Sequence, residues 1–292
     1  MSDTRRIGRY EFGSLIGKGA AASVYRGADG QKTVALKLVS PSAVSPERLA
    51  ALRETAARLA RVRHPAIVPF VELIEHEKAV CLVSELAQGE PLAAVLKSGE
   101  RPDLRRTWEI ARQVLEALEA AHSRDLFHGD LKLANIFIDG QGRVTLTDFG
   151  LAGLVPNAGT PEFMAPEQLS GAIPDARTDV YQAGALIYLL LTGLPPFSGA
   201  REEVMQRVRE ERPADPSSMV AKLAWQLDWV VQRALSKDPV DRFGSAREFI
   251  DGLRLGLQES LGAPLPLAKA VAASEVPVVE KKPPPAPAAG AG

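Results

Sequence analysis

Three residues in the stretch 127–150 carry side chains that together could bind a divalent metal ion. Asp130 and Asn135 lie in a polar loop that leads into an apolar strand at 136–138, and Asp148 follows a second short strand after a tight turn. A hairpin of this kind brings two carboxylates and one carboxamide around a small volume. Mg²⁺ in proteins is usually held by one or two carboxylates together with substrate phosphates. The stretch therefore predicts a site for magnesium and a phosphate-bearing substrate.

The order of these residues resembles the catalytic loop and the Asp-Phe-Gly segment of the protein kinases. The match covers five positions in register, which are His128, Asp130, Lys132, Asn135 and the start of Asp148-Phe149-Gly150. Gly129 departs from the pattern, because most protein kinases carry Arg there. The tripeptide His-Gly-Asp also opens this loop in small-molecule kinases of the same fold family. A small-molecule phosphotransferase is therefore an alternative to a protein kinase.

The N-terminal part of the chain predicts an antiparallel meander with a glycine-containing link at 17–24. Glycine lets the backbone approach a phosphate closely and offer N–H donors. With the strand 34–37 after it, the link resembles the kinase glycine-rich loop and its strand-borne lysine. Lys37 lies on a mostly apolar strand and needs an anionic partner, which the phosphates of ATP would supply. Ala22 replaces the usual third glycine and should stiffen the loop.

A helix predicted over about 45–63 should carry the partner of this lysine. In the protein kinases a Glu on this helix pairs with the lysine, and Glu54 is the candidate here. At 100° per residue Glu54 lies almost opposite the apolar stripe, whereas Thr55 lies nearer to the position of the family's Glu. We expect a one-residue bulge to bring Glu54 round. The alternative is that Lys37 lacks its usual partner.

By the same resemblance, a hinge at 85–90 connects two lobes and binds adenine. Backbone groups of Glu85 and Ala87 would meet the adenine edge, and Glu90 could hold a ribose hydroxyl. Ser84 falls where a side chain gates the back of the adenine pocket, and its small size should leave extra room. The nucleotide-binding residues that the resemblance implies are Ile16, Gly17, Lys18, Gly19, Ala20, Ala22, Val24, Ala35, Lys37, Glu54, Ser84, Glu85, Ala87, Glu90, Asn135, Phe137 and Asp148.

The resemblance also assigns roles in phosphoryl transfer. Asp130 would accept or orient the incoming hydroxyl proton, and Lys132 would reach the transferred γ-phosphate. Lys37 would hold the α- and β-phosphates, and Thr160 should hydrogen-bond near Asp130 and Lys132. The metal ligands would be Asp148 for the Mg²⁺ that bridges the phosphates and Asn135 for a second ion. ATP and Mg²⁺, with Mn²⁺ as a substitute, are the cofactors implied.

The segment after Asp148 carries a prediction about regulation. In the family, an Arg at position 129 receives a phosphorylated residue of the activation segment. Here that Arg is replaced by Gly129, and no Ser, Thr or Tyr occurs between Asp148 and Thr160. We therefore expect the segment to be ordered without phosphorylation. Further on, Arg242 should form a buried ion pair with Glu167 of the Ala-Pro-Glu triplet.

Composition excludes several other classes of protein. A formal net charge of -1 gives no reason to expect nucleic acid or an anionic membrane as a partner. Cys81 is the single cysteine, which excludes internal disulfides and indicates a buried thiol. No signal peptide opens the chain, and its apolar runs are far shorter than the ~20 residues of a membrane span. We expect no membrane segment and a cytoplasmic location.

The predicted fold is α+β, a bilobal kinase-like fold with a small antiparallel-sheet lobe and a larger, mainly helical lobe. The predicted divisions are a flexible N-terminus at 1–9, a kinase domain at 10–258 (N-lobe 10–84, hinge 85–90, C-lobe 91–258) and an Ala/Pro-rich tail or linker at 259–292. The tail could lead to a further module or a membrane anchor.

The leading functional hypothesis is a bacterial-type serine/threonine protein kinase. Lys132, two residues after Asp130, resembles the Ser/Thr rather than the Tyr kinases, and the partner would be a protein with a Ser or Thr acceptor. Beside the small-molecule phosphotransferase, a second alternative is a nucleotide-binding scaffold without activity. The unsettled partner of Lys37 and the substitution at Ala22 are its only support.

Overall fold

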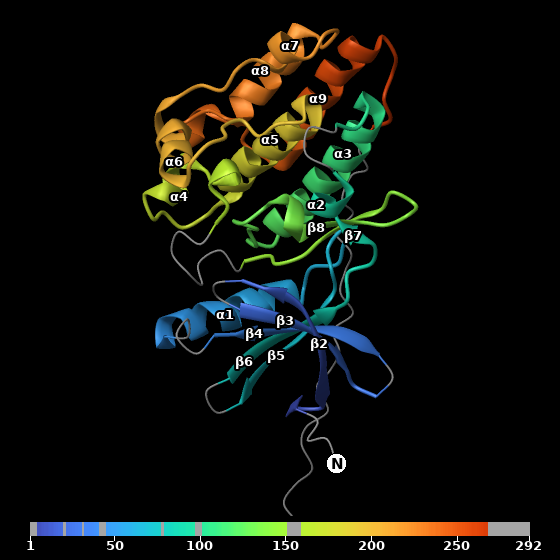
Figure 1. Ribbon diagram of the computed structural model, residues 1–292, viewed down its shortest axis with the longest axis vertical. Coiled ribbons are helices and arrows are strands. Elements are labelled where there is room, and N and C mark those ends of the chain that lie inside the picture. The colour runs from blue at the N-terminus through green and yellow to red at the C-terminus, as the bar shows by residue number, and fades with distance from the viewer. Residues whose placement is uncertain are drawn as a thin grey trace, which may run out of the picture.

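The computed structural model places two lobes one above the other, with the sheet-rich N-terminal lobe below and the helical C-terminal lobe above in Figure 1. The residues that the structure describes are 5–19, 22–30, 32–40, 45–76, 79–96, 101–150 and 159–267. Helices and strands are segregated between the lobes rather than alternating along the chain. This is the α+β bilobal architecture that the sequence predicts.

A six-stranded antiparallel sheet builds the N-terminal lobe. Its strands are β1 (Arg6–Ile7), β2 (Tyr10–Lys18), β3 (Ala22–Ala28), β4 (Thr33–Val39), β5 (Phe70–His76) and β6 (Ala79–Glu85), in the spatial order β1-β2-β3-β4-β6-β5. Leu36 of β4 and Val83 of β6 are paired across the sheet and fully buried. Cys81 is also buried, as predicted, and this burial raises the pKa of its thiol to about 12.

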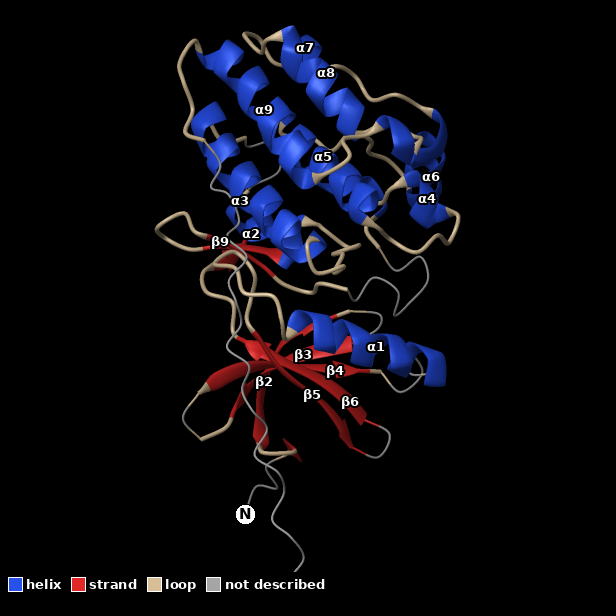
Figure 2. Cartoon of the chain, turned by 180° about the vertical axis from the view of Figure 1, so that it is seen from behind, coloured by secondary structure: helices blue, strands red, loops and turns tan. Residues whose placement is uncertain are grey.

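Helix α1 (Pro46–Leu59) lies between this sheet and the helical lobe, as Figure 2 shows from behind. The side chain of Ser45 accepts a hydrogen bond from the Arg48 amide, and proline follows at the first helical position. Leu52, Ala56 and Leu59 form the buried stripe. The helix is α-helical throughout and ends at Leu59, four residues before the predicted end near 63.

The C-terminal lobe packs its helices around one central, almost wholly buried helix. Its helices are α2 (Leu92–Val95), α3 (Leu104–His122), α4 (Pro166–Leu169), α5 (Ala176–Thr192), α6 (Arg201–Glu210), α7 (Pro216–Met219), α8 (Trp225–Ala234) and α9 (Ala246–Leu261). The central one is α5, in which thirteen of seventeen residues are buried. Asp175 caps its N-terminus, and Gly193 ends it in a left-handed conformation with φ +81°.

A small sheet at the junction of the lobes carries the catalytic loop. Its strands are β7 (Glu90–Pro91), β8 (Ile136–Ile138) and β9 (Val144–Leu146), all antiparallel. Gly89 allows the end of the hinge to reach this sheet, because its φ is +84° and a Cβ there would lie 2.2 Å from the Ile138 carbonyl oxygen. The hinge and the loop before β8 are therefore fixed against each other.

Two predicted boundaries differ from the structure. Ile7 pairs with Tyr10 and is buried, so residues 5–9 belong to the folded lobe rather than to a flexible N-terminus. At the other end, α9 runs to Leu261, and Leu265 is buried in the main core. The fold therefore continues past the predicted boundary at 258, because these leucines still find apolar partners. Residues 1–4 and 268–292 lie outside the described part.

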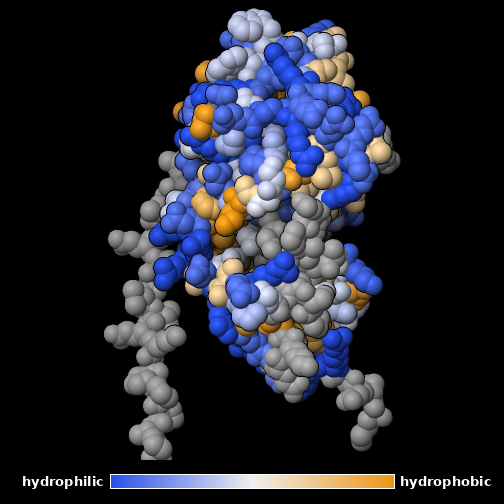
Figure 3. All heavy atoms as spheres, turned by 90° about the vertical axis from the view of Figure 1, so that its left-hand side faces the viewer, coloured by the Kyte–Doolittle hydropathy of each residue, from blue (hydrophilic) through white to orange (hydrophobic). Residues whose placement is uncertain are grey.

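One side of the molecule is mostly hydrophilic, and its most visible hydrophobic side chains lie near the level where the lobes meet (Figure 3). Within the described residues, no helix combines the length and hydrophobicity needed to cross a bilayer. The predicted location of the protein stays a prediction.

Candidate active site

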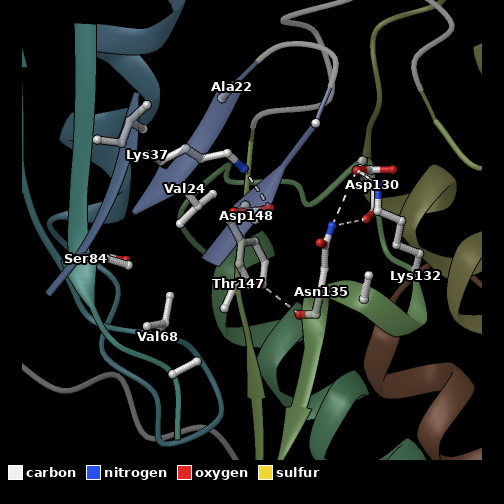
Figure 4. Close-up of a pocket in the computed structure, with 18 of the residues that line it drawn as sticks. Ala22, Val24, Lys37, Val68, Ser84, Asp130, Lys132, Asn135, Thr147 and Asp148 are labelled. Carbon is white, nitrogen blue, oxygen red and sulfur yellow. Dashed lines mark hydrogen bonds and ion pairs between the residues drawn. The ribbon is translucent and has the colours of Figure 1, made fainter. Parts of the chain in front are cut away.

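A cavity of about 960 Å³ lies between the two lobes. Strands β2, β3 and β4 line its N-lobe side, and the loops beside β8 and β9 line its C-lobe side, which we call the floor (Figure 4). The predicted residues that line it are Ile16, Gly17, Lys18, Gly19, Ala22, Val24, Ala35, Lys37, Ser84, Glu85, Ala87, Asp130, Lys132, Asn135, Phe137 and Asp148. The structure thus brings together residues that are up to 132 positions apart, from Ile16 to Asp148.

Lys37 and Asp148 meet across the cavity. The Lys37 Nζ lies 2.7 Å from Asp148 Oδ2, and Figure 4 draws this ion pair between β4 and the segment after β9. The backbone of Asp148 has a φ of +68°, in the left-handed region that aspartate tolerates better than most residues. The ion pair joins the lobes through two partly buried side chains.

On the floor of the cavity, Asp130 accepts three contacts from its own loop. The Lys132 Nζ lies 2.6 Å from Asp130 Oδ2, and the side-chain nitrogen of Asn135 donates to the Asp130 carbonyl oxygen at 2.9 Å and to Oδ2 at 3.4 Å. The Thr147 amide in turn donates to the Asn135 carbonyl oxygen at 3.0 Å, which sets Asp148 beside the loop. Because the amide nitrogen of Asn135 is engaged as a donor, its side-chain oxygen is the atom suited to a cation.

The donor set fits a magnesium ion that shares its ligands with a phosphate. Among the described residues, no three His, Cys, Asp or Glu side chains gather closely enough to form a metal cage of their own. Asp148 and Asn135 provide one carboxylate and one amide oxygen on the same side of the cavity. Such a partial set of oxygen ligands suits Mg²⁺, which usually completes its shell with substrate phosphates and water.

A single buried carboxylate of α5 holds the backbone of the catalytic loop. Asp179 is fully buried and accepts hydrogen bonds from the His128 amide at 2.8 Å and the Gly129 amide at 2.7 Å. His122 Nε2 lies 2.8 Å from the same carboxylate. A buried carboxylate with three such partners is fully satisfied and fixes the backbone that bears Asp130.

Two glutamine amides meet at the carbonyl group of Gly129. Gln168, in α4, donates to the Gly129 oxygen at 2.7 Å, and Gln182, in α5, donates to it at 3.0 Å. Gln182 also accepts from the Leu131 amide at 2.9 Å, and Gln168 accepts from the Ala165 amide at 3.0 Å. Gly129 has a φ of +71°, which glycine adopts without strain. We call this set of contacts the glutamine bridge.

His128 lies under the loop as a neutral structural group. Its ring is fully buried and packs on Phe149 with the ring centres 4.6 Å apart. Burial lowers the pKa of His128, and the nearby carboxylates of Asp179, Asp130 and Asp148 only partly oppose this. His128 Nδ1 accepts a hydrogen bond from the Asp130 amide at 3.3 Å, as a neutral imidazole can.

Comparison with known proteins agrees with this geometry. Residues 10–251 match the family model described as the protein kinase domain. The chain belongs to the protein kinase family. Since the matched region covers most of the chain and includes both lobes, the fold is that of a bilobal protein kinase. Proteins of this family use ATP and a divalent metal.

Two similar proteins come from bacteria. A probable serine/threonine-protein kinase of Streptomyces coelicolor is 34% identical over 291 residues, covering 90% of this chain and 43% of that protein. The serine/threonine-protein kinase PknB of Mycobacterium tuberculosis is 32% identical over 260 residues, covering 82% of this chain and 41% of that protein. The chain therefore spans less than half the length of these two relatives.

Glu54 does not join the site of this kinase domain. Its side chain is 73% exposed, and its ionic partner is Arg58, 3.9 Å away on the same helix. The expected bulge is wrong, because α1 is a regular α-helix that keeps Glu54 on its outer face. Thr55 instead faces the Asp-Phe-Gly segment, since a Cβ on Gly150 would lie 2.5 Å from the Thr55 methyl group. Asp148 is the carboxylate that meets Lys37.

Three other predicted residues lie apart from the cavity or outside the described part. Glu90 starts β7 and is exposed, and it does not line the cavity. Among the described residues, no hydrogen bond joins the Thr160 side chain to Asp130 or Lys132, because Lys132 is paired with Asp130 itself. Ala20 falls outside the described residues, as does the activation segment at 151–158. The order of that segment stays a prediction.

Arg242 and Glu167 form a buried ion pair in the C-terminal lobe. Arg242 is 1% exposed and grips both carboxylate oxygens of Glu167, at 2.8 and 2.7 Å. It also donates to three backbone carbonyl groups, those of Ser236, Arg177 and Lys237. Burial alone would raise the pKa of Glu167, but the hydrogen bonds and charge of Arg242 outweigh it and lower that pKa. The pair predicted from the sequence is present.

Sequence reasoning missed the residues that brace the loop. No sequence motif assigns a role to Asp179, Gln168 or Gln182. A signal was available for Gln182, because a glutamine inside the run of buried residues of α5 needs buried hydrogen-bonding partners. The back of the cavity also contains apolar residues that no motif names, such as Val68 and Leu82.

Proposed function

We propose that this chain is a serine/threonine protein kinase, which transfers the γ-phosphate of ATP to a protein hydroxyl group. The observation that carries the proposal is the convergence of Lys37, Asp130, Lys132, Asn135 and Asp148 on one cavity between two lobes. The names of the relatives support Ser and Thr as acceptors. Lys132, two residues after Asp130, supports the same choice.

The side chains divide the work of the reaction by position. Asp130, hydrogen-bonded into a rigid loop, accepts or orients the proton of the incoming hydroxyl group, a role worth about 10²–10⁴ in rate. Lys132, 2.6 Å from Asp130, would turn from that carboxylate to the γ-phosphate. Lys37 would leave Asp148 for the inner phosphates. Mg²⁺, held by Asp148 and Asn135, would neutralise charge on the phosphates.

We infer in addition that activity does not need a phosphorylated activation segment. A phosphorylated residue in this segment usually acts by pairing with the Arg that here is Gly129. The glutamine bridge supplies another link: Gln168 contacts both Ala165, at the end of the segment, and Gly129, in the catalytic loop. The connection between segment and loop thus uses neutral amides that need no modification.

The test is phosphoryl transfer by chain that carries no phosphate. The purified protein is treated with phosphatase, its mass is checked, and it is incubated with Mg²⁺, radiolabelled ATP and a generic Ser/Thr-containing protein. We expect label in phosphoserine or phosphothreonine of the polypeptide, and none with Asp148→Asn. A strict requirement for phosphate on Thr160 would contradict the regulatory inference and leave the kinase activity intact.

Two other outcomes would favour the alternatives. Label in a small-molecule acceptor, with none in polypeptide, would point to the phosphotransferase that the His-Gly-Asp tripeptide suggests. Nucleotide binding with no turnover, unchanged in Asp130→Ala, would point to a scaffold. The observation that favours a scaffold is the exposed position of Glu54, which leaves Lys37 without a partner on α1.

A further inference from the structure

Helix α8 exposes two tryptophans one turn apart. Trp225 is 70% and Trp229 56% exposed, although indole rings are among the most costly side chains to leave in water. The third tryptophan of the chain, Trp108, is fully buried. Positions i and i+4 of a helix share one face, so the two exposed indoles form a single aromatic surface. This surface lies in the helical lobe, away from the active-site cavity.

The aromatic surface borders a hollow of about 1040 Å³. Beside the two indoles, the hollow contains the side chains of Arg212, Asp215, Asp238 and Asp241. Arg233 stacks near one of the rings, with its guanidinium carbon 5.5 Å from the centre of Trp229. The hollow is therefore a groove with aromatic and charged walls, which suits a polar, extended chain rather than a compact apolar ligand.

The charges that remain unpaired in this groove are negative. Arg212 is paired with Asp215 at 2.9 Å and Arg233 with Glu248 at 2.8 Å, while Lys237 donates to the Val208 carbonyl group at 2.7 Å. Asp238 and Asp241 are exposed, and within the described part of the chain no ion pair is recorded for either. The groove thus combines two indoles with two carboxylates that are available to a cationic partner.

We propose that residues 281–287 of this same chain, Lys-Lys-Pro-Pro-Pro-Ala-Pro, dock in this groove. Proline-rich segments bind to aromatic-lined grooves because their extended helix loses little conformational entropy on binding. Prolines 283–285 would cover the indoles of Trp225 and Trp229. Lys281 and Lys282 would approach the carboxylates of Asp238 and Asp241.

Helix α9, the last helix in the described part of the chain, ends beside the start of α8. The Ala224 amide, directly before Trp225, donates to the Ser260 hydroxyl near the end of α9 at 2.9 Å. Residues 268–282, which join Leu267 to the proline run, can span up to about 50 Å, whereas α8 is only about 15 Å long. The joining residues can therefore span more than three times the length of the helix that carries the two tryptophans.

Tethering makes even a weak contact effective. A linked partner is present at an effective concentration of about 1 mM for a short flexible linker. A contact with a Kd of about 0.1 mM would then be about nine-tenths occupied within one molecule. The same contact between separate molecules would be sparsely occupied at micromolar protein. Intramolecular docking is therefore the form of the interaction that the groove and the tail favour.

Tryptophan fluorescence tests the proposal without relying on kinase activity. The full chain is compared with a variant in which Pro283, Pro284 and Pro285 are changed to Ser, using acrylamide as the quencher. We expect the quenching constant to rise by about twofold, with a red shift of emission, since two of three indoles lose their cover. The matched control is Pro277→Ser, outside the docking segment, which should match the unaltered chain.

A second measurement uses the groove directly. A synthetic peptide of residues 279–289 is added to the triple-Ser variant, and we expect it to restore protection of the indoles. Lys281→Gln together with Lys282→Gln should weaken docking, and raised salt should do the same. Equal quenching of the full chain and the triple-Ser variant would overturn the proposal. A difference that appears only as protein concentration rises would show docking between copies and would overturn intramolecular docking.

Discussion

The two sides of the active-site cavity are built in different ways. On the C-lobe side, the catalytic loop is tied by Asp179 and the glutamine bridge, with five hydrogen bonds of 2.7–3.0 Å to the backbone of His128, Gly129 and Leu131. On the N-lobe side, Lys37 has one ionic partner, and that partner, Asp148, belongs to the other side. No carboxylate of α1 approaches it, since Glu54 is exposed.

The difference indicates which part of the site is ready before substrate binds. A loop whose buried backbone groups are all paired is costly to move, so the floor is preorganised for chemistry. Lys37 is positioned by the anion that it meets, which is Asp148 in this structure. We infer that the fold alone fixes the catalytic loop, whereas Lys37 reaches its ATP-binding position only when the nucleotide phosphates are present.

The largest effect is expected from a substitution of Asp130, the reacting group of the catalytic loop. Asp130→Asn keeps the shape of the side chain but removes its ability to accept a proton, so kcat should fall about 10²–10⁴-fold. Binding of ATP, measured by calorimetry, should change by less than about twofold, which is within the range of a surface contact. Asp251→Asn, on an exposed position of α9, is the matched control. A kcat within tenfold of the unaltered protein would show that Asp130 is not the reacting group.

The next largest effect is expected from loss of the ion pair between Arg242 and Glu167. Arg242→Ala leaves the buried carboxylate of Glu167 unpaired, and the free energy of unfolding should fall by about 3–5 kcal/mol in a denaturant titration. Arg143→Ala, which breaks an exposed pair with Asp139, should cost only about 0–1 kcal/mol. Equal losses of unfolding free energy in the two variants would show that the Arg242–Glu167 pair contributes no more than an exposed one.

The same pair predicts a dependence on pH. The pKa of Glu167 is lower in the folded chain than in the unfolded one, so its contribution is present above about pH 4.5 and is lost as the pH falls through the lower folded value. The unfolding free energy of the unaltered chain should therefore drop more steeply under acid than that of Arg242→Ala.

A smaller effect is expected from the glutamine bridge. Gln182→Met keeps the size of the side chain but removes its hydrogen bonds to the Leu131 amide and to the Gly129 carbonyl group. The Gly129 oxygen keeps Gln168 as a donor, whereas the Leu131 amide is left without an acceptor, and one such buried unpaired donor corresponds to about a tenfold fall in kcat. Gln168→Met removes the link to the activation segment and should act similarly. KM for ATP should stay unchanged for both. A fall in ATP affinity with constant kcat would show that the glutamine bridge supports nucleotide binding rather than the catalytic loop.

The smallest effects are expected on α1. Glu54→Gln should leave kcat/KM for ATP within about twofold, because an exposed pair with Arg58 contributes little. Thr55→Glu places a carboxylate on the face toward the Asp-Phe-Gly segment and should raise kcat/KM by roughly two- to fivefold, the range of a weak ion pair. Loss of activity in Glu54→Gln would show that α1 turns during the reaction and that the N-lobe side does supply a partner.

Local patterns in the sequence predicted which polar residues meet in the cavity. Asp130, Asn135 and Asp148 share one hairpin, so their spacing alone brings them together, and Lys37 follows from its strand. The helical rotation also placed Glu54 away from the lysine. The bulge was the wrong choice between two explanations, because nothing in a regular helix compensates for its cost.

Contacts between distant segments could not be predicted in this way. Gln182 and Gln168 lie 53 and 39 residues from Gly129, and they meet it only because α4 and α5 pack beneath the loop. The end of the fold was also hidden, since Leu261 and Leu265 stand in an Ala- and Pro-rich context. Their partners in the core become visible only once the helices are assembled.

The most direct test of this comparison is a crystal structure of the phosphate-free chain with Mg²⁺ and a non-hydrolysable ATP analogue. We predict that the hydrogen bonds of Asp179, Gln168 and Gln182 to the catalytic loop are unchanged and that Lys37 has left Asp148 while Glu54 remains exposed. A structure in which the Gly129 carbonyl group has lost its glutamine donors would contradict a catalytic loop that is fixed before nucleotide binds. A structure in which Glu54 hydrogen-bonds to Lys37 would contradict a lysine that is positioned by the nucleotide alone.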